Sequence, residues 1–212
     1  MFKILIKLYL LPCVLCAPIS AFANSALGID AITVCMNFGC KAKQVIAINQ
    51  NEWDGAANWF SLSAETAEQE RNQIKKAVGW MEVIAGRHTP THNDVGGNLS
   101  EGATFPGQLD CIDESLNTDT YLKLFELNGF LKHHKVVERA YRRAIFDQHW
   151  SGQIEEVDSG ERWVVDSWFQ NNGNLPYVQK SKLWEDIPLF TSILDNSQDN
   201  SEKQSWLKKV FN

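Results

Sequence analysis

The stretch Gln108-Leu109-Asp110-Cys111-Ile112-Asp113-Glu114-Ser115 opens an amphipathic segment whose pattern predicts a helix from about Cys111 to Asn128. A helix N-terminus has unpaired backbone N–H groups and a partial positive charge, so it stabilises a thiolate or an oxyanion beside it. The neighbouring acids help only if their side chains cap backbone N–H groups, because a carboxylate facing the sulfur disfavours a thiolate. The stretch therefore predicts a helix that presents one cysteine at its start.

Two segments further along the chain carry a histidine and an aspartate that could serve this cysteine. His149 lies within Ile145–Glu156 and Asp166 within Arg162–Phe169, two predicted strands separated by the turn composition of Val157–Gly160. Two registers are compatible with that turn, one with His149 and Asp166 directly opposite and one with them displaced along the strands. Both registers have the same parity, so the two side chains share a face. A buried aspartate must be paired, and holding a histidine tautomer is one way to pair it.

The motif Asp110-Cys111-Ile112-Asp113 resembles the D-C-x-D helix start of bacterial transglutaminase-like cysteine proteinases, a family related to papain. The order of cysteine, histidine and aspartate along the chain is also similar, and the resemblance covers about residues 105–170. It implies that Cys111 is a nucleophile, that His149 is its general base and acid, and that Asp166 orients the histidine.

The resemblance also implies the surroundings of this triad. Trp150 and Trp168 would flank the His149–Asp166 pair and exclude water. An oxyanion hole would form from the Cys111 backbone N–H and the side chain of Gln108. The chain departs from the family at Leu109, which stands where a glycine usually precedes the D-C pair.

The implied fold is α+β, with a papain-like or transglutaminase-like core in which the nucleophile helix packs on an antiparallel sheet. A length of 212 residues suits one compact domain. The resemblance implies that residues 24–104 form an N-terminal strand and helix extension and that residues 105–212 form the catalytic core and a C-terminal tail. The clearest helix of the extension is predicted at Ser63–Arg87, with apolar residues at helical spacing: Ile74, Ala77, Val78, Met81 and Ile84.

The first residues have the features of a secretory signal peptide. Lys3 and Lys7 form a basic start, Leu8–Ile19 an apolar centre, and Ala21-Phe22-Ala23 a cleavage motif. These features predict a signal at residues 1–23, cleavage after Ala23, and a periplasmic or secreted protein that is free of the membrane. A transmembrane anchor is the alternative, although the apolar run is short.

The cysteines fit an exported protein. Of five cysteines, Cys13 and Cys16 leave with the signal, and Cys35 and Cys40 enclose a short loop that predicts a disulfide in an oxidising compartment. The remaining Cys111 is a buried apolar residue, an intermolecular link or a working thiol. The absence of a C-x-x-C motif from the sequence argues against a redox or metal role for it.

Charge and motifs narrow the class of partner. The formal net charge is −6, and it becomes more negative once the signal lysines leave, which argues against nucleic acid or anionic lipid. His88, His92 and Asp94 could ligate a metal, but two histidines one helical turn apart chelate only on a helix, and Pro90 opposes a helix. We therefore expect no metal and no cofactor, and a polar loop that lines the cleft.

Together these features predict an exported thiol enzyme that acts on a peptide or amide bond through a thioester intermediate. The expected partner is a protein or peptide substrate. Hydrolysis is favoured over acyl transfer because water is the default acceptor. The alternative is a catalytically inactive transglutaminase-like binding or accessory protein of the periplasm. The sequence does not indicate the oligomeric state.

Overall fold

The computed structural model describes residue 29 and residues 31–98, 105–144 and 147–186. The predicted signal peptide, residues 1–23, lies outside the described residues, as does most of the predicted C-terminal tail. Within the described part, no helix is both long enough and apolar enough to span a bilayer.

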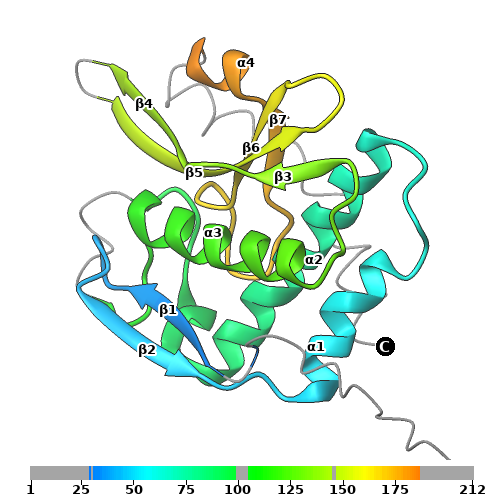
Figure 1. The fold of residues 1–212 in the computed structure, drawn as a ribbon. Helices are drawn as coiled ribbons and strands as arrows, with labels where there is room; N and C mark the ends of the chain where they lie inside the picture. Colours follow the sequence, from blue (N-terminus) through cyan, green and yellow to red (C-terminus); the bar gives the residue numbers. More distant parts are fainter. Residues whose placement is uncertain (1–28, 30, 99–104, 145–146, 187–212) are drawn as a thin grey trace, which may run out of the picture.

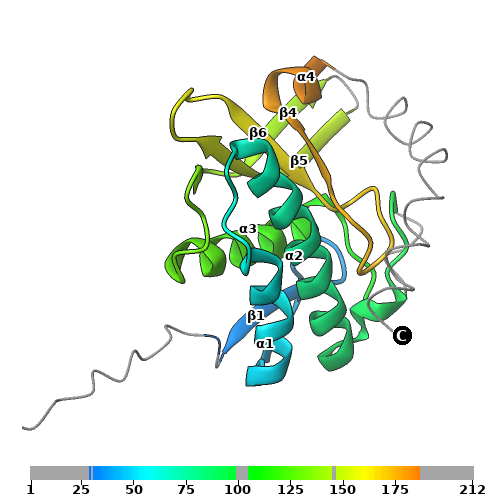
Figure 2. The ribbon, with the colours of Figure 1, turned by 90° about the vertical axis from the view of Figure 1, so that its right-hand side faces the viewer.

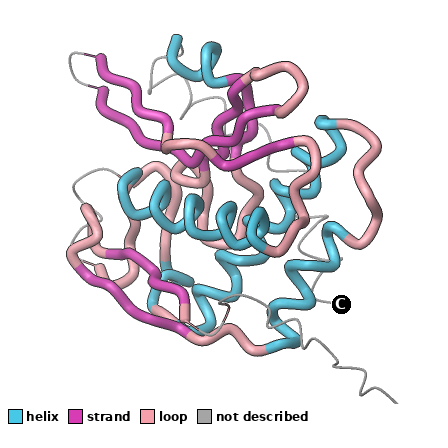
Figure 3. The backbone as a smooth tube through the Cα atoms, viewed as in Figure 1, coloured by secondary structure: helices cyan, strands magenta, loops and turns pink. Residues whose placement is uncertain are grey.

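The protein is α+β, with helices packed against antiparallel sheets, and this confirms the predicted class (Figures 1 and 3). The helices are α1 (Gln50–Ala57), α2 (Ala67–His88), α3 (Cys111–Leu127) and α4 (Ser181–Asp186), with short 3-10 helices η1 (Asn58–Phe60) and η2 (Pro90–Asn93). The strands are β1 (Ile32–Met36), β2 (Ala42–Ile46), β3 (His134–Val136), β4 (Ala140–Ala144), β5 (Asp147–Glu156), β6 (Arg162–Asp166) and β7 (Tyr177–Lys180).

Two sheets enclose helix α3. Strands β1 and β2 form a hairpin, and a five-stranded sheet has the order β3-β5-β6-β7, with β4 also paired to β5. Figure 1 shows α3 lying between the hairpin and the larger sheet, with α4 on the far side of that sheet. Figure 2, turned by 90°, shows α2 crossing α3, with α1 beside α2. The arrangement places the N-terminus of α3 beside strand β5, where it brings Cys111 next to Gln148.

The long helix α2 supplies much of the core. The apolar residues predicted to share one face of it, Ile74, Ala77, Val78, Met81 and Ile84, are all 0% exposed. The helix begins four residues later than predicted because the side chain of Thr66, not of Ser63, accepts the capping hydrogen bond, from Gln69 N–H at 3.2 Å. Its last residue is His88, so Gly86 lies inside the helix.

The register between β5 and β6 is neither of the two predicted ones. Gly152 pairs with Val165 and Glu155 with Arg162, because the connecting loop occupies Val157–Gly160. Gly160 adopts a left-handed φ of +70°, which closes this loop. The parity is as predicted, so His149 and Asp166 share a face but meet diagonally.

Strand β6 ends at Asp166, three residues earlier than predicted. The chain turns there, with the Gln170 N–H donating to Ser167 O at 2.8 Å. The turn moves Trp168 and Phe169 out of the sheet and over the edge of β5, where their rings lie 4.9 and 5.2 Å from the ring of His149.

Candidate active site

Cys111 is the first residue of α3, as predicted from the sequence. It is half-buried and is the free cysteine among the described residues. Its sulfur lies 4.0 Å from the carbonyl oxygen of Gln148 on β5, and its side chain packs against Trp168 and Phe169. The helix therefore presents the thiol to the strand that carries His149.

The acids beside Cys111 cap the helix. Asp110 accepts hydrogen bonds from the N–H groups of Ile112 and Asp113 at 3.0 and 2.9 Å, and Asp113 accepts one from Asp110 N–H at 3.3 Å. This is a capping box, in which residues at both positions satisfy otherwise unpaired N–H groups. The condition set by the sequence, that the acids bind backbone N–H groups, is met.

Cys35 and Cys40 form a disulfide, as predicted, at the tip of the β1–β2 hairpin. The residues from Asn37 to Cys40 all have positive φ, between 56° and 69°. For residues other than glycine this conformation costs on the order of 1 kcal/mol or more each. This backbone conformation directs consecutive N–H groups towards α3, where they donate to Asp110 and Asp113 at 2.6 to 2.8 Å.

His149 and Asp166 form a buried pair. The ring nitrogen Nε2 of His149 lies 2.8 Å from Asp166 Oδ2, and the two residues are 0% and 1% exposed. An ionised carboxylate only accepts hydrogen bonds, so Nε2 carries the proton and Nδ1 is the basic nitrogen of the neutral ring. The structure thus brings together two of the three predicted catalytic side chains in the geometry of a tautomer lock.

The third predicted side chain, Cys111, is an electrostatic neighbour of His149. His149 Nδ1 is buried and has no regular hydrogen bond within the described residues. Burial alone would lower the pKa of His149, but Asp166 and then the Cys111 side chain raise it to about 9. Since Nε2 is bound to Asp166, Nδ1 is the ring nitrogen available to Cys111.

Trp184 of helix α4 completes the pair, and the sequence analysis missed it. Its indole Nε1–H donates to Asp166 Oδ2 at 2.8 Å, and its ring lies 5.5 Å from the ring of His149. Trp184 is 0% exposed. In the sequence, Trp184 is a tryptophan in a short polar segment after Pro176. This pattern does not indicate which part of the fold the segment packs against.

Arg142 holds Trp184 in place. Its guanidinium lies 4.6 Å above the Trp184 ring and donates to Trp184 O at 2.6 Å. Arg142 pairs with His149 across β4 and β5 and is 6% exposed, although a solvent-facing basic patch is the ordinary expectation for the run Arg139, Arg142 and Arg143. Strand alternation explains the difference, because it points Arg142 inwards between two outward-facing neighbours.

Of the two tryptophans expected to flank the His149–Asp166 pair, one lies beside His149 and the other does not. The Trp168 ring is 4.9 Å from the His149 ring, as the resemblance implies. Trp150 follows His149 directly in β5 and therefore points to the opposite face, where it packs 4.5 Å from the Tyr141 ring and 4.7 Å from the Arg139 guanidinium. Trp150 does not flank His149.

Both ends of the Gln108 side-chain amide are hydrogen-bonded to residues 93–98. Its amide nitrogen donates to Asn93 O at 2.5 Å, and its amide oxygen accepts from the Asn98 side chain and from Val95 N–H. The residue is 5% exposed. Its observed contacts hold the 93–98 loop against the start of α3.

The 93–98 loop packs tightly against the turn that carries Trp168. Gly97 N–H donates to Trp168 O at 2.7 Å, and a Cβ at Gly96 would lie 2.5 Å from the backbone of Gln170. A larger residue at Gly96 would displace this turn. The Gly-rich segment therefore fixes the position of Trp168 beside Cys111.

The possible metal ligands of this region have separate partners. His88 Nε2 lies 3.0 Å from Glu52, His92 Nδ1 lies 3.1 Å from Thr89 O, and Asp94 accepts from Leu109 N–H at 2.7 Å. Pro90 begins the 3-10 helix η2 rather than an open loop. No group of three or more metal-binding side chains gathers within the residues that the structure describes.

Several acids lie buried beneath the site. Burial and mutual repulsion raise the pKa of Glu82 to about 8, of Asp94 to about 7 and of Asp113 to about 6. The same causes raise the pKa of Glu114 well above its usual range. Glu114 is 2% exposed and lies in the first turn of α3.

Comparisons with models of known protein families, with curated proteins and with solved structures found no match to this chain.

Proposed function

We propose that the protein is a thiol enzyme of transglutaminase-like type, in which Cys111 attacks the carbonyl carbon of a peptide or amide bond. The observation that carries the proposal is the buried His149–Asp166 hydrogen bond of 2.8 Å, which leaves the second ring nitrogen of His149 without a hydrogen bond among the described residues, on the strand whose Gln148 carbonyl lies 4.0 Å from the Cys111 sulfur. A histidine with one nitrogen fixed by a carboxylate and the other next to a thiol is the arrangement that thiol catalysis requires. A papain-like core is part of the same proposal.

In the proposed reaction His149 holds the thiol proton as an imidazolium, and Cys111 reacts as a thiolate at the positive end of α3. Attack forms a carbon–sulfur bond and places negative charge on the carbonyl oxygen. The imidazolium then gives its proton to the leaving amine, and a thioester remains on Cys111. Water or a second amine, deprotonated by His149, releases the acyl group and regenerates the thiol.

Two donors are suited to the oxyanion. The backbone N–H of Cys111 forms no hydrogen bond within the described residues and lies in the first turn of α3. The indole N–H of Trp168 is buried and also lacks a partner there, and its ring packs against Cys111. A buried unpaired N–H is costly to the fold, and a role in stabilising transient charge accounts for its retention. We propose these two groups in place of Gln108.

An exported location belongs to the same proposal. The Cys35–Cys40 disulfide is compatible with an oxidising compartment, and the first 23 residues have the pattern of a secretory signal. A protein or peptide of that compartment is the proposed substrate, and water the proposed acceptor.

The test is to trap the thioester. The protein is incubated with p-nitrophenyl acetate and the mass of the Cys111 peptide is measured by mass spectrometry, with and without hydroxylamine. The proposal predicts a burst of p-nitrophenol, an acetyl group on Cys111 that hydroxylamine removes, and neither signal in Cys111→Ser. Acetylation of Cys111 at the same rate in His149→Ala would contradict catalysis and favour a binding protein that retains the fold.

A further inference from the structure

The disulfide loop contacts the nucleophile helix through its backbone. The N–H groups of Phe38 and Cys40 donate to the two oxygens of Asp113 at 2.7 and 2.6 Å, and Gly39 N–H donates to Asp110 at 2.8 Å. Among the described residues, Asp110 and Asp113 accept six such hydrogen bonds, and half of these come from this loop.

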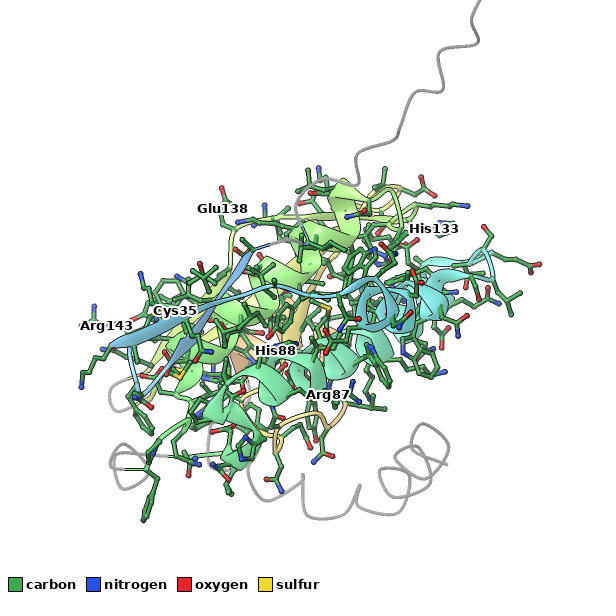
Figure 4. All side chains as sticks on the ribbon, turned by 90° about the horizontal axis from the view of Figure 1, so that it is seen from below. Cys35, Arg87, His88, His133, Glu138 and Arg143 are labelled. Atoms are coloured by element: carbon green, nitrogen blue, oxygen red, sulfur yellow. A yellow bond between two sulfur atoms is a disulfide. The ribbon has the colours of Figure 1, made fainter. Side chains whose placement is uncertain are left out.

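Further contacts fasten the ends of the loop to the same helix start. The Asn117 side chain of α3 accepts from Cys35 N–H at 2.8 Å and donates to Cys35 O at 3.0 Å. Asn37 donates its N–H to Gln108 O at 2.9 Å, and its side chain accepts from Gly107 N–H at 3.0 Å. Figure 4 shows Cys35 on β1, the strand that lies across α3.

The loop holds a conformation that an open chain avoids. Its residues from Asn37 to Cys40 are left-handed in succession, and the successive N–H groups form a concave cup of the kind that binds anions. The disulfide closes this loop across a sequence separation of five. Without the disulfide, the residues regain access to the favoured right-handed and extended regions, and the cup opens.

Opening the cup has an electrostatic consequence for Cys111. Asp110 precedes Cys111 directly, and Asp113 lies two residues after it. When three of their six N–H partners leave, the two carboxylates are less compensated and free to turn, and their charge then disfavours a thiolate at Cys111. With the loop open, Asp110 and Asp113 would therefore disfavour ionisation of the Cys111 thiol.

We infer that the Cys35–Cys40 disulfide is a redox-controlled clamp on the nucleophile: the oxidised loop neutralises Asp110 and Asp113, and its reduction lowers the reactivity of the Cys111 thiol. This inference names a means of regulating the site proposed above and rests on that proposal for its effect on reactivity.

The redox step is ordinary thiol–disulfide exchange with a dithiol as reductant. The dithiol gives two electrons to the sulfur–sulfur bond, Cys35 and Cys40 each take up one proton, and the dithiol closes to its own disulfide. Gly39 is exposed and Cys40 half-buried, so the loop lies at the surface. A reductant, which ordinarily protects a cysteine nucleophile, is thus expected to weaken this one.

The first arm of the test does not depend on catalysis. Amide hydrogen exchange is compared between the wild-type protein and Cys35→Ser/Cys40→Ser, with circular dichroism as the check on folding. A clamp predicts faster exchange in residues 37–40 and 108–114, with α2 and β5–β6 unchanged. Equal exchange in the two proteins at residues 108–114 would overturn the inference whatever the protein does.

The second arm measures the rate of Cys111 alkylation by iodoacetamide at pH 6.5, located by mass spectrometry. At this pH an ordinary free thiol is about 1% ionised, which slows its alkylation. Its thiolate is intrinsically more nucleophilic than a thiolate of lower pKa, and this offsets part of the loss. Loss of the clamp therefore predicts a decrease in the alkylation rate of about tenfold. Dithiothreitol should slow wild-type alkylation to the rate of the double serine variant and leave that variant unchanged.

Matched variants separate the clamp from general loss of stability. Asp113→Asn added to the Cys35→Ser/Cys40→Ser protein should restore part of the alkylation rate, because it removes one of the two uncompensated charges, whereas Asp119→Asn on the same helix, whose partner is the exposed Lys123, should not change it. If the serine variant fails to fold, Gly39→Ala retains the disulfide but strains a φ of +69°, and it should lower the alkylation rate in the same way. Faster amide exchange at residues 108–114 without slower alkylation would show that the disulfide loop holds the helix start but that Cys111 is not an activated thiol. That result would contradict the proposed function and not the structural role of the loop.

Discussion

The indole N–H of Trp184 lies 2.8 Å from Asp166 Oδ2, the same oxygen that binds His149 at 2.8 Å. Two donors thus fix one carboxylate oxygen inside a layer of aromatic rings. The contact joins helix α4 to the end of β6, and it makes the orientation of His149 depend on a segment that follows the rest of the site in sequence.

Replacing Trp184 with phenylalanine should loosen the site and lower stability. The change removes one hydrogen bond to a charged group, worth about 1.5–3 kcal/mol, and retains most of the ring. We expect urea denaturation to show that loss and Cys111 alkylation at pH 6.5 to slow several-fold. Trp59→Phe is the control, because the Trp59 indole has no hydrogen bond within the described residues. Equal effects of both substitutions would mean that the Asp166 contact has no special role.

The indole N–H of Trp168 should matter for acylation but not for alkylation. Trp168→Phe retains aromatic packing next to Cys111 and removes one proposed oxyanion donor, which predicts about a hundredfold slower acetylation by p-nitrophenyl acetate. Alkylation by iodoacetamide forms no oxyanion, so its rate should change little. Trp163→Phe, on the same stretch of chain, is the control. Parallel losses in both reactions of Trp168→Phe would indicate damage to the thiol itself.

Stability should fall as the pH rises from about 5 to 8.5. Burial, the largest cause, raises the pKa of Glu82, Asp94 and Asp113 to about 8, 7 and 6, and that of Glu114 well above its usual range. A group with a raised pKa binds more protons in the folded state, so its stabilisation is complete below its unfolded pKa and is lost through its folded pKa. His149, with a pKa raised to about 9, acts in the same direction above pH 6.5.

Calorimetry can measure this effect as the melting temperature between pH 5.5 and 8.5. We expect a decrease of roughly 5 °C or more across that interval. Glu114→Gln has nearly the same volume but cannot ionise, so it should flatten the decrease. A melting temperature that rises with pH would show that these acids are ionised in the folded protein at low cost.

Glu70 should be a stability residue with no effect on the thiol. It is 1% exposed and accepts hydrogen bonds from the N–H groups of Lys132, His133 and His134, and it pairs with the His134 ring at 2.9 Å. Burial opposes ionisation, but these hydrogen bonds lower the pKa of Glu70 below its usual value. Its contribution is therefore present above pH 4.5 and is lost as the pH falls.

Glu70→Gln should destabilise the protein by roughly 2 kcal/mol in urea denaturation, because a neutral amide accepts these hydrogen bonds less well. The alkylation rate of Cys111 should stay at the wild-type value. Glu68→Gln, an exposed neighbour on α2, should change stability by only a few tenths of a kcal/mol. Slower alkylation in Glu70→Gln would link the β3 end of the sheet to the site.

The sequence predicted the parts of this fold that depend on local signals. Helical spacing identified α2 and its buried face, and the D-C-x-D motif located the start of α3 and its capping acids. Both predicted registers of β5 and β6 were wrong because the composition of a turn indicates where the chain bends but not how many residues the loop contains. The parity survived the error, since both predicted registers and the observed one differ by an even number of positions.

What the sequence missed depends on contacts between distant segments. Trp184 reaches Asp166 from a helix beyond β7, and Arg142 is buried because α4 covers it. The disulfide itself was predictable from two cysteines that enclose a short loop. Its contact with Asp110 and Asp113 was not, because those acids lie more than 70 positions away in sequence. Trp150, expected to flank the pair, lies on the other face of β5 because adjacent strand residues alternate.

The central claim is that His149 and Asp166 activate Cys111, and the pH dependence of Cys111 alkylation by iodoacetamide tests it most directly. We predict that the wild-type rate reaches its plateau well below pH 8.5, where a free thiol is half ionised, and that His149→Ala and Asp166→Ala shift the profile towards that value. A wild-type profile centred near pH 8.5 and unchanged by either substitution would contradict the account and leave a fold that serves binding.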